Sequence, residues 1–251
     1  MSAKAYGKQF YTGQRDGSFV GAQKVLPVVL SLVPCRSLLD VGCGVGPWVA
    51  SALEQGVTDA LGIDGDWVSR SLLSIPEDRF ESHDLAKPFD LRRKFDLVVC
   101  MEVAEHLKEP SADVLVDNLV RHGDCILFSA AVPGQGGTNH VNEQWPDYWR
   151  DKFARRGYRQ LDIVRAVTWN DREIPSCYRQ NAYLFVAESK LPQHPTLVGA
   201  AEQSKPVAWI HPELFADALR RPLPLRRILK ELPSALSATL RARFSRLVGR
   251  G

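Results

Sequence analysis

Short apolar runs recur along the first 190 residues, and glycine, proline or charged residues separate them. Seven runs have the length and composition of strands, at about 37–42, 59–64, 79–83, 95–101, 124–130, 160–168 and 181–188. Apolar positions three and four residues apart predict helices at about 21–32, 47–55, 67–74, 112–121 and 146–156. Because helices and strands alternate, we expect an α/β fold, in which helices cover both faces of a mainly parallel sheet and a ligand binds at the carboxyl ends of its strands.

The pattern changes near residue 190, where prolines interrupt a segment of little periodicity. We therefore expect one domain over residues 1–189, with residues 1–20 as a lid segment over the ligand, followed by an extension over residues 190–251. Short helices are predicted in this extension at about 225–232 and 234–248. The second is amphipathic, because its apolar residues recur at 4-4-3 spacing, at Leu236, Leu240, Phe244 and Leu247.

Charge is distributed unevenly along the chain. The net charge is +3, but the residues from Arg220 onward carry nine basic side chains and one acid, so the preceding body is mildly acidic. An acidic body argues against an extended nucleic-acid groove. The basic, amphipathic end predicts a contact with an anionic membrane surface, or packing on the domain or on a second copy of the chain.

The cysteines and the apolar stretches bear on where the protein resides. The five cysteines are scattered and have no C-x-x-C spacing, which is typical of reduced thiols in a cytoplasmic protein. The first eight residues lack the apolar core of a secretory signal, and no apolar stretch approaches the ~18–20 residues of a membrane span. We expect a cytoplasmic protein, with any membrane contact peripheral and at the inner face.

A glycine turn between a predicted strand and a predicted helix is the clearest candidate for a ligand site. Residues 38–48 read LLDVGCGVGPW, with Gly42, Gly44 and Gly46 in the turn and Pro47 suited to the first helical position. The free N–H groups of a helix start favour a negatively charged ligand group. The next predicted strand ends in Asp64, a carboxylate placed to accept the two hydroxyls of a ribose. A nucleoside-bearing cofactor is implied.

The third glycine of this turn comes one residue earlier than in the dinucleotide fingerprint G-x-G-x-x-G. With the segments 62–67, 82–85 and 95–106 that follow in order, it resembles the first motifs of class I S-adenosylmethionine-dependent methyltransferases, over about residues 18–188. The resemblance implies a seven-stranded, Rossmann-like sheet whose last strand is antiparallel, and S-adenosylmethionine as the cofactor. It implies cofactor contacts by Asp40, Gly42, Cys43, Gly44, Gly46, Asp64, Gly65, Trp67, Asp84, Leu85 and Glu102.

Asp84 and Leu85 resemble the family's adenine-binding turn, although an aspartate in this place also fits a helix cap or an Asx turn.

The sequence EVAEH at residues 102–106 predicts a second chemical centre after the fourth strand. If these residues are helical, Glu102, Glu105 and His106 share one face, and two carboxylates with an imidazole suit a divalent cation. His140, in the loop after the fifth strand, is the candidate fourth ligand.

The arrangement resembles the metal motif of small-RNA 2′-O-methyltransferases and ubiquinone-pathway O-methyltransferases. The resemblance implies Mg²⁺ or another divalent cation that activates the acceptor hydroxyl, with Glu102, His106 and His140 as catalytic residues. In metal-free relatives of that pattern the glutamate contacts the cofactor and the first histidine caps a helix, and His140 would then be the general base.

The loop GQGGTNHVNEQW at 134–145 resembles that of bacterial methyltransferases from glycan and secondary-metabolite pathways. We expect an O-methyltransferase that acts on a hydroxyl of a sugar, a glycan or a small polyol. The alternatives are an N- or C-methyltransferase of a small metabolite and a non-catalytic cofactor-binding scaffold that acts through its basic end. Small-RNA methylation is disfavoured by the acidic body. Trp145, Tyr148 and Trp149 fit either an acceptor-stacking surface or the packed face of a helix.

Overall fold

The computed structural model describes residues 8–203 and 209–220, together with Leu225, Leu229, Leu232, Pro233 and Ser237. Residues 1–215 form one compact unit and residues 216–251 a second. The second unit contains the end of one helix, and its described single residues, at 225, 229, 232, 233 and 237, are helical. The predicted amphipathic residues Leu236, Leu240, Phe244 and Leu247 lie outside the described residues.

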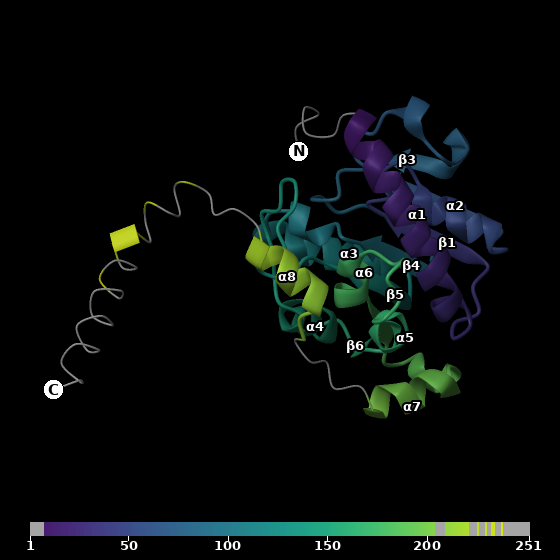
Figure 1. Ribbon diagram of the computed structural model, residues 1–251. Coiled ribbons are helices and arrows are strands. Elements are labelled where there is room, and N and C mark those ends of the chain that lie inside the picture. Colours follow the sequence, from purple (N-terminus) through teal and green to yellow (C-terminus); the bar gives the residue numbers. More distant parts are fainter. Residues whose placement is uncertain are drawn as a thin grey trace. The chain divides into compact units, whose positions relative to one another are not determined.

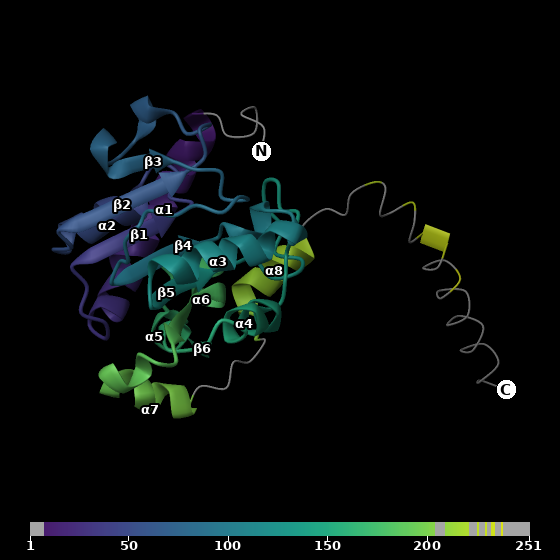
Figure 2. The same cartoon turned by 180° about the vertical axis from the view of Figure 1, so that it is seen from behind.

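Seven strands form one sheet in the order β3-β2-β1-β4-β5-β7-β6 (Figures 1 and 2). The strands are β1 Ser37–Val41, β2 Asp59–Asp64, β3 Phe80–Ser82, β4 Leu97–Met101, β5 Cys125–Ser129, β6 Tyr158–Leu161 and β7 Tyr183–Ala187. The first five strands pair in parallel, and β7 runs antiparallel to both β5 and β6. This is the Rossmann-like sheet that the sequence predicts, with the last strand antiparallel as expected.

Helices cover both faces of the sheet (Figures 1 and 2). The helices are α1 Lys8–Leu30, α2 Pro47–Glu54, α3 Ala112–His122, α4 Pro146–Ala154, α5 Val164–Thr168, α6 Ser176–Asn181, α7 Pro195–Gln203 and α8 Pro212–Arg220. Residues of α1, α2, α5, α6 and α7 share one buried apolar cluster with the sheet, and residues of α3 and α4 share the other. Within the described part of the chain, no helix combines the length and apolarity that a membrane crossing requires.

Several predicted boundaries are wrong, and each error has a local physical reason. Helix α1 begins at Lys8 instead of residue 21, so residues 8–20 of the expected lid segment are helical. The strand predicted at 160–168 ends at Leu161, because the buried positions 161, 164, 165 and 168 have helical spacing and form α5. Between 67 and 74 only a short 3-10 turn forms, at Arg70–Leu72.

The region after residue 190, predicted to lack regular structure before residue 225, contains α7 and α8, which begin at Pro195 and Pro212. Proline suits a first helical position because its missing N–H has no partner there in any case.

Residues 209–213 are anchored on α6 by two buried side chains. Arg179 is 3% exposed and donates hydrogen bonds to the carbonyls of Ile174 and Trp169, at 2.9 and 3.3 Å, and to the Glu213 carboxylate. The neighbouring Gln180 side chain donates to the Trp209 carbonyl and accepts from the backbone N–H of His211. These contacts fix the start of α8 beside the helix that leads into β7.

Two arginines that reach the same carboxylate allow this anchor to be tested. Replacing Arg179 by Met removes donors from buried carbonyls, so we expect the free energy of unfolding to fall by about 2–3 kcal/mol. Arg172 lies 3.9 Å from Glu213 but is 88% exposed, and Arg172→Met is expected to change stability by less than about 0.5 kcal/mol. Urea denaturation of both variants measures the difference, and equal effects would contradict the anchor.

Candidate active site

The glycine turn between β1 and α2 is built on positive backbone angles. Gly42, Gly44 and Gly46 have φ values of 84°, 54° and 89°, a region that other residues rarely adopt. A Cβ atom on Gly42 would lie 2.4 Å from a methyl carbon of Val103. The N–H groups of Gly42 and Cys43 both donate to the carbonyl of Ile63, at 2.8 and 3.1 Å, which fixes the turn on β2.

Asp64 closes this turn from the end of β2. Its carboxylate accepts hydrogen bonds from the backbone N–H groups of Gly44, at 2.8 Å, and Gly65, at 2.6 Å. Burial raises the pKa of Asp64 to about 6, although both N–H donors act against the rise. Each carboxylate oxygen has a further lone pair, so the side chain can accept ligand hydroxyls as well.

Asp40, at 2% exposure, has an oxygen without a hydrogen-bond partner, and burial with the nearby Asp64 charge raises its pKa well above the usual range.

A pocket opens beside the glycine turn, between it and the end of β4. Its lining includes Gly42, Cys43, Gly44 and Glu102 among the predicted cofactor residues, and also Ser18, Val45, Pro47, Trp48, Met101 and Tyr178. The Tyr178 hydroxyl donates to the Ser18 hydroxyl at 3.1 Å, and its ring packs edge-on against Trp48. Tyr178 is not among the predicted cofactor residues, and it lies in α6, just before the last strand. Ser18 falls within the segment expected to act as a lid.

The turn after β3 has the alternative structure that the sequence allows. Asp84 accepts a hydrogen bond from the Ala86 N–H at 3.1 Å, which makes an Asx turn, and its ion pair with Lys87 lowers its pKa. Leu85 is buried in the core. Gly65 lies under the ring of Trp67, since a Cβ atom at residue 65 would come within 2.1 Å of it. None of these contacts tests whether Asp84 and Leu85 bind an adenine ring, so that contact stays a prediction.

Glu102 occupies a strained backbone position at the end of β4. Its φ of 55° is rare for a residue with a side chain, and its N–H donates to the carbonyl and hydroxyl oxygens of Ser129. Its carboxylate accepts hydrogen bonds from Gln135, at 2.6 Å, and Asn181, at 3.1 Å. Burial raises the pKa of Glu102, and the two amide donors partly offset the rise.

Three of the four predicted metal ligands come together. Ligand atoms of Glu105, His106 and His140 lie within 4.8 Å of one another. Glu105 is fully buried and neither of its oxygens has a hydrogen-bond partner, while the Nδ1 atom of His106 also lacks one. Glu102 is outside this group. Only Ala104–His106 is helical, as a 3-10 turn, so the single helical face predicted for residues 102–106 does not form.

The protonation states in this group follow from burial. The pKa of Glu105 is raised well above its usual range by desolvation and then by the charge of Glu102. Burial, together with His140, lowers the pKa of His106 to about 4, so its imidazole is neutral at pH 7. A neutral imidazole keeps the lone pair that a metal ligand or a base needs.

Glu143, to which the sequence assigns no role, organises the loop that carries His140. Its carboxylate accepts hydrogen bonds from the N–H groups of Gly134 and Gly136, at 2.8 and 2.6 Å, and lies 2.9 Å from Nδ1 of His140. With Nδ1 held in this way, Nε2 of His140 lies 4.0 Å from the Glu105 carboxylate. The second histidine is thus oriented toward the first two ligands.

The aromatic run at the start of α4 is mainly a packed helix face. Trp149 is 3% exposed and packs on Phe128 with ring centroids 5.2 Å apart, and Tyr148 contacts Trp149 edge-on. Trp145 precedes the helix and is 41% exposed. The packing interpretation therefore holds for Tyr148 and Trp149.

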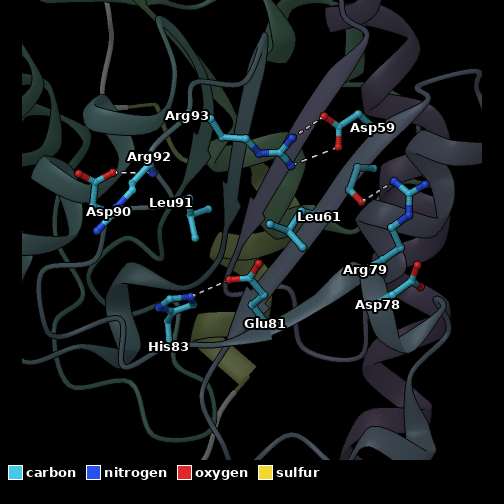
Figure 3. A pocket seen from close by; sticks show the side chains of 11 residues that line it. Asp59, Leu61, Asp78, Arg79, Glu81, His83, Asp90, Leu91, Arg92 and Arg93 are labelled. Atoms are coloured by element: carbon cyan, nitrogen blue, oxygen red, sulfur yellow. Dashed lines mark hydrogen bonds and ion pairs between the residues drawn. The ribbon is translucent and has the colours of Figure 1, made fainter.

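A separate hollow of about 540 Å³ lies over β2 and β3, where the connection from β3 to β4 contains no α-helix among its described residues (Figure 3). Its charged walls are largely paired: Arg93 binds both oxygens of Asp59, and His83 lies 3.1 Å from Glu81. Figure 3 shows Leu61 and Leu91 between the two pairs, with Arg93 and Asp59 above them and His83 and Glu81 below. Charges on an edge strand discourage pairing with another chain.

Part of the chain is similar in sequence to known methyltransferases. Residues 18–122 match the model of a family described as a methyltransferase domain. Over 105 residues the chain is 32% identical to a ubiquinone biosynthesis O-methyltransferase of Methylococcus capsulatus, a match that covers 38% of this chain and 43% of that protein. Over 132 residues it is 30% identical to the Serratia proteamaculans enzyme of the same name, covering 45% and 53%. The chain thus spans about half the length of the curated relatives it matches.

Solved structures share the fold at low sequence identity. A sugar N-methyltransferase from a Streptoalloteichus species has a TM-score of 0.53 at 18% identity, over 72% of this chain and 92% of that one. Human N-acetylserotonin methyltransferase, solved with S-adenosylmethionine, has a TM-score of 0.51 at 16% identity, over 71% and 55%. The chain therefore has the Rossmann-like fold of class I methyltransferases.

Glycine at residue 42 can be required by its backbone angle or by the lack of space for a side chain. A second glycine with nearly the same backbone angle distinguishes these two causes. Gly42 and Gly134 have φ values of 84° and 87°, but a Cβ atom would clash with Val103 at residue 42 and meets nothing within 4 Å at residue 134. We expect Gly134→Ala to cost about 1 kcal/mol of stability and Gly42→Ala about 2–4 kcal/mol. Thermal or urea unfolding measures both, and equal losses would show that Val103 does not constrain the turn.

Proposed function

We propose that the protein transfers the methyl group of S-adenosylmethionine to a hydroxyl of a sugar, a glycan or a small polyol, with the help of a divalent cation. One observation carries the proposal: Glu102 lines the pocket beside the glycine turn and lies three residues from Glu105, the buried member of the Glu105, His106 and His140 group. The donor pocket and the candidate cation group thus meet where β4 ends. The matches to proteins named O-methyltransferases support oxygen as the atom methylated.

The cofactor would lie against the glycine turn. Asp64 offers acceptor lone pairs for the ribose hydroxyls, and Gly42 and Gly44 allow close backbone approach to the methionine end. The Glu102 carboxylate, which lines the same pocket, is the acidic group available to the cofactor's ammonium. S-adenosylmethionine brings an activated methyl group, so the protein's main task is to align the acceptor oxygen with it.

The group Glu105, His106 and His140 fits a cation. Glu105 is a fully buried carboxyl group with two unpartnered oxygens, an arrangement that is costly unless a cation or a proton satisfies it. Two imidazoles with one carboxylate favour a transition-metal ion over Mg²⁺, which prefers oxygen ligands. Such an ion supplies Lewis-acid activation of an acceptor hydroxyl and fixes its position.

Without a cation in this group, Nε2 of His140 keeps its lone pair, and His140 is then the side chain best placed to accept the hydroxyl proton. Glu143 holds its Nδ1 atom, which leaves Nε2 directed toward Glu105 and His106. A carboxylate on one ring nitrogen stabilises the imidazolium that forms when the other nitrogen takes a proton. The hydrogen bonds from Gln135 and Asn181 hold Glu102 in place beside the donor pocket during transfer.

Asp64 gives the first test of this function. Asp64→Ala is expected to weaken S-adenosylmethionine binding about 10–100-fold, because a hydrogen bond to a charged group contributes roughly 1.5–3 kcal/mol. The wild-type affinity should fall as the pH drops below the Asp64 pKa of about 6, by at most about tenfold per pH unit, since protonation removes acceptor lone pairs. Calorimetry measures both effects. Asp66→Ala, at an exposed position in the same loop, is the matched control, and wild-type affinity in folded Asp64→Ala would exclude Asp64 from the site.

Chelation tests the cation. Excess EDTA should abolish methyl transfer while cofactor binding stays within about twofold, and added Mn²⁺ should restore the activity. Glu105→Gln should weaken Mn²⁺ binding at least about tenfold by calorimetry, whereas Glu109→Gln, at an exposed position on the next turn, should not change it. Undiminished turnover in excess chelator would remove the cation from the mechanism and leave His140 as the base.

A further inference from the structure

A second, narrower cavity between α4 and the strands β5, β6 and β7 is lined by polar atoms that have no partner. Its lining consists of Phe128, Ala130, Pro146, Trp149, Gln160, Asn181, Tyr183 and Phe185. Five side-chain atoms on four of these residues are buried without a hydrogen bond: both amide atoms of Gln160, Oδ1 of Asn181, the Tyr183 hydroxyl and Nε1 of Trp149. All four side chains belong to residues no more than 4% exposed.

So many unpartnered polar groups in one place need an explanation. Buried polar groups in native proteins nearly always have a hydrogen-bond partner, and each one left without a partner costs about 1–3 kcal/mol. Gln160 is the strongest case, because a leucine at this position in β6 would fill similar space without an unsatisfied amide. The set therefore points to a polar group that enters the cavity from outside the chain.

The chemistry of the lining restricts what can enter. The residues that line the cavity include no charged side chain, so neither a carboxylate nor an ammonium group would find a counter-ion there. The unpartnered atoms include donors, on Gln160, Trp149 and Tyr183, and acceptors, on Gln160, Asn181 and Tyr183. A hydroxyl matches this mixture because it donates one hydrogen bond and accepts two.

The cavity is adjacent to the proposed reaction centre through Asn181. The amide nitrogen of Asn181 donates to Glu102 at 3.1 Å and to Gln135 at 2.8 Å, while its Oδ1 atom is the unpartnered one. One side chain thus contacts the donor-pocket carboxylate and lines the cavity. The whole cavity has a volume of about 10 Å³, which is room for a single water- or hydroxyl-sized group.

We propose that this cavity is an acceptor subsite that binds one hydroxyl or hydroxymethyl group of a neutral, polyhydroxylated acceptor, a group other than the one that is methylated. The inference rests on the proposed function and adds to it the residues that select the acceptor: Gln160, Tyr183 and Trp149 with Asn181. A carboxylate, an ammonium or an apolar group entering the cavity would leave these groups unsatisfied or itself unpaired. Selection by unpaired polar groups is effective because the wrong ligand leaves them buried and unpartnered.

Binding of neutral glycosides to the full chain saturated with S-adenosylhomocysteine tests the subsite. The probes are the methyl glycosides of D-glucose, D-galactose, D-mannose and L-rhamnose, measured by saturation-transfer NMR, with D-glucuronate as the charged comparison. We expect at least one neutral glycoside to bind and glucuronate not to bind. Gln160→Leu should weaken the bound glycoside about tenfold or more, and Tyr183→Phe about three- to tenfold.

Tyr148→Phe is the matched control, because its hydroxyl is also buried and unpartnered but Tyr148 does not line the cavity. This variant should bind the glycoside as the wild type does, and all variants should keep their affinity for S-adenosylhomocysteine within about twofold. Tyr183→Phe removes a single oxygen, so it serves if Gln160→Leu fails to fold.

Two results would overturn the subsite: no binding of any of the four glycosides by the cofactor-bound wild type, or unchanged glycoside binding in Gln160→Leu and Tyr183→Phe. The second result, with higher stability of Gln160→Leu, would mean that the cavity holds only a buried water. A chain that binds no S-adenosylhomocysteine contradicts the proposed function and this inference with it. Cofactor binding without glycoside binding contradicts the inference alone.

Discussion

The buried carboxylate of Glu102 joins the parts of this site. Its backbone N–H binds Ser129 at the end of β5, and its carboxylate accepts from Gln135 in the following loop and from Asn181 at the end of α6. These partners come from segments far apart in the sequence, and the donor pocket, the Glu105 group and the cavity at Asn181 all adjoin them. The left-handed backbone of Glu102, with φ of 55°, persists because these bonds over-determine its position.

The Val103 side chain links the strained backbone of Glu102 to the glycine turn between β1 and α2. Glu102 turns the chain sharply at the end of β4, and the next residue, Val103, then packs against Gly42, where a Cβ atom would lie 2.4 Å from it. A glycine in the first motif and a strained glutamate in the fourth are therefore parts of one packing arrangement. With Val103 in this position, the turn can close only if residue 42 has no side chain.

The sequence predicted those parts of the fold and the site whose structure depends on neighbouring residues in the chain. Apolar runs predicted β1 to β5. The glycines at 42, 44 and 46 predicted positive backbone angles, because no other residue type adopts them as readily. The proximity of Glu105, His106 and His140 was also predicted, since parallel strands end at one edge of the sheet. The separation of Glu102 from them was not, because glutamate carries no local signal for a left-handed backbone. Helix α5 was not predicted either, because its apolar residues fit a strand as well as a helix. The burial of residues 161, 164, 165 and 168 identifies the helix.

The balance of charge in the site supports the proposed donor. Asp40, Asp64, Glu102 and Glu105 are carboxyl groups whose pKa values burial raises, and the donor pocket contains no lysine or arginine among its described lining residues. Keeping several carboxylates buried without cations is unfavourable, so a positively charged ligand gains from entering. S-adenosylmethionine carries a sulfonium and an ammonium, and a divalent cation would add to them. By contrast, the cavity at Gln160 and Tyr183 has no charged lining residue and only polar atoms to satisfy, so the proposed donor pocket and the proposed acceptor subsite differ in charge.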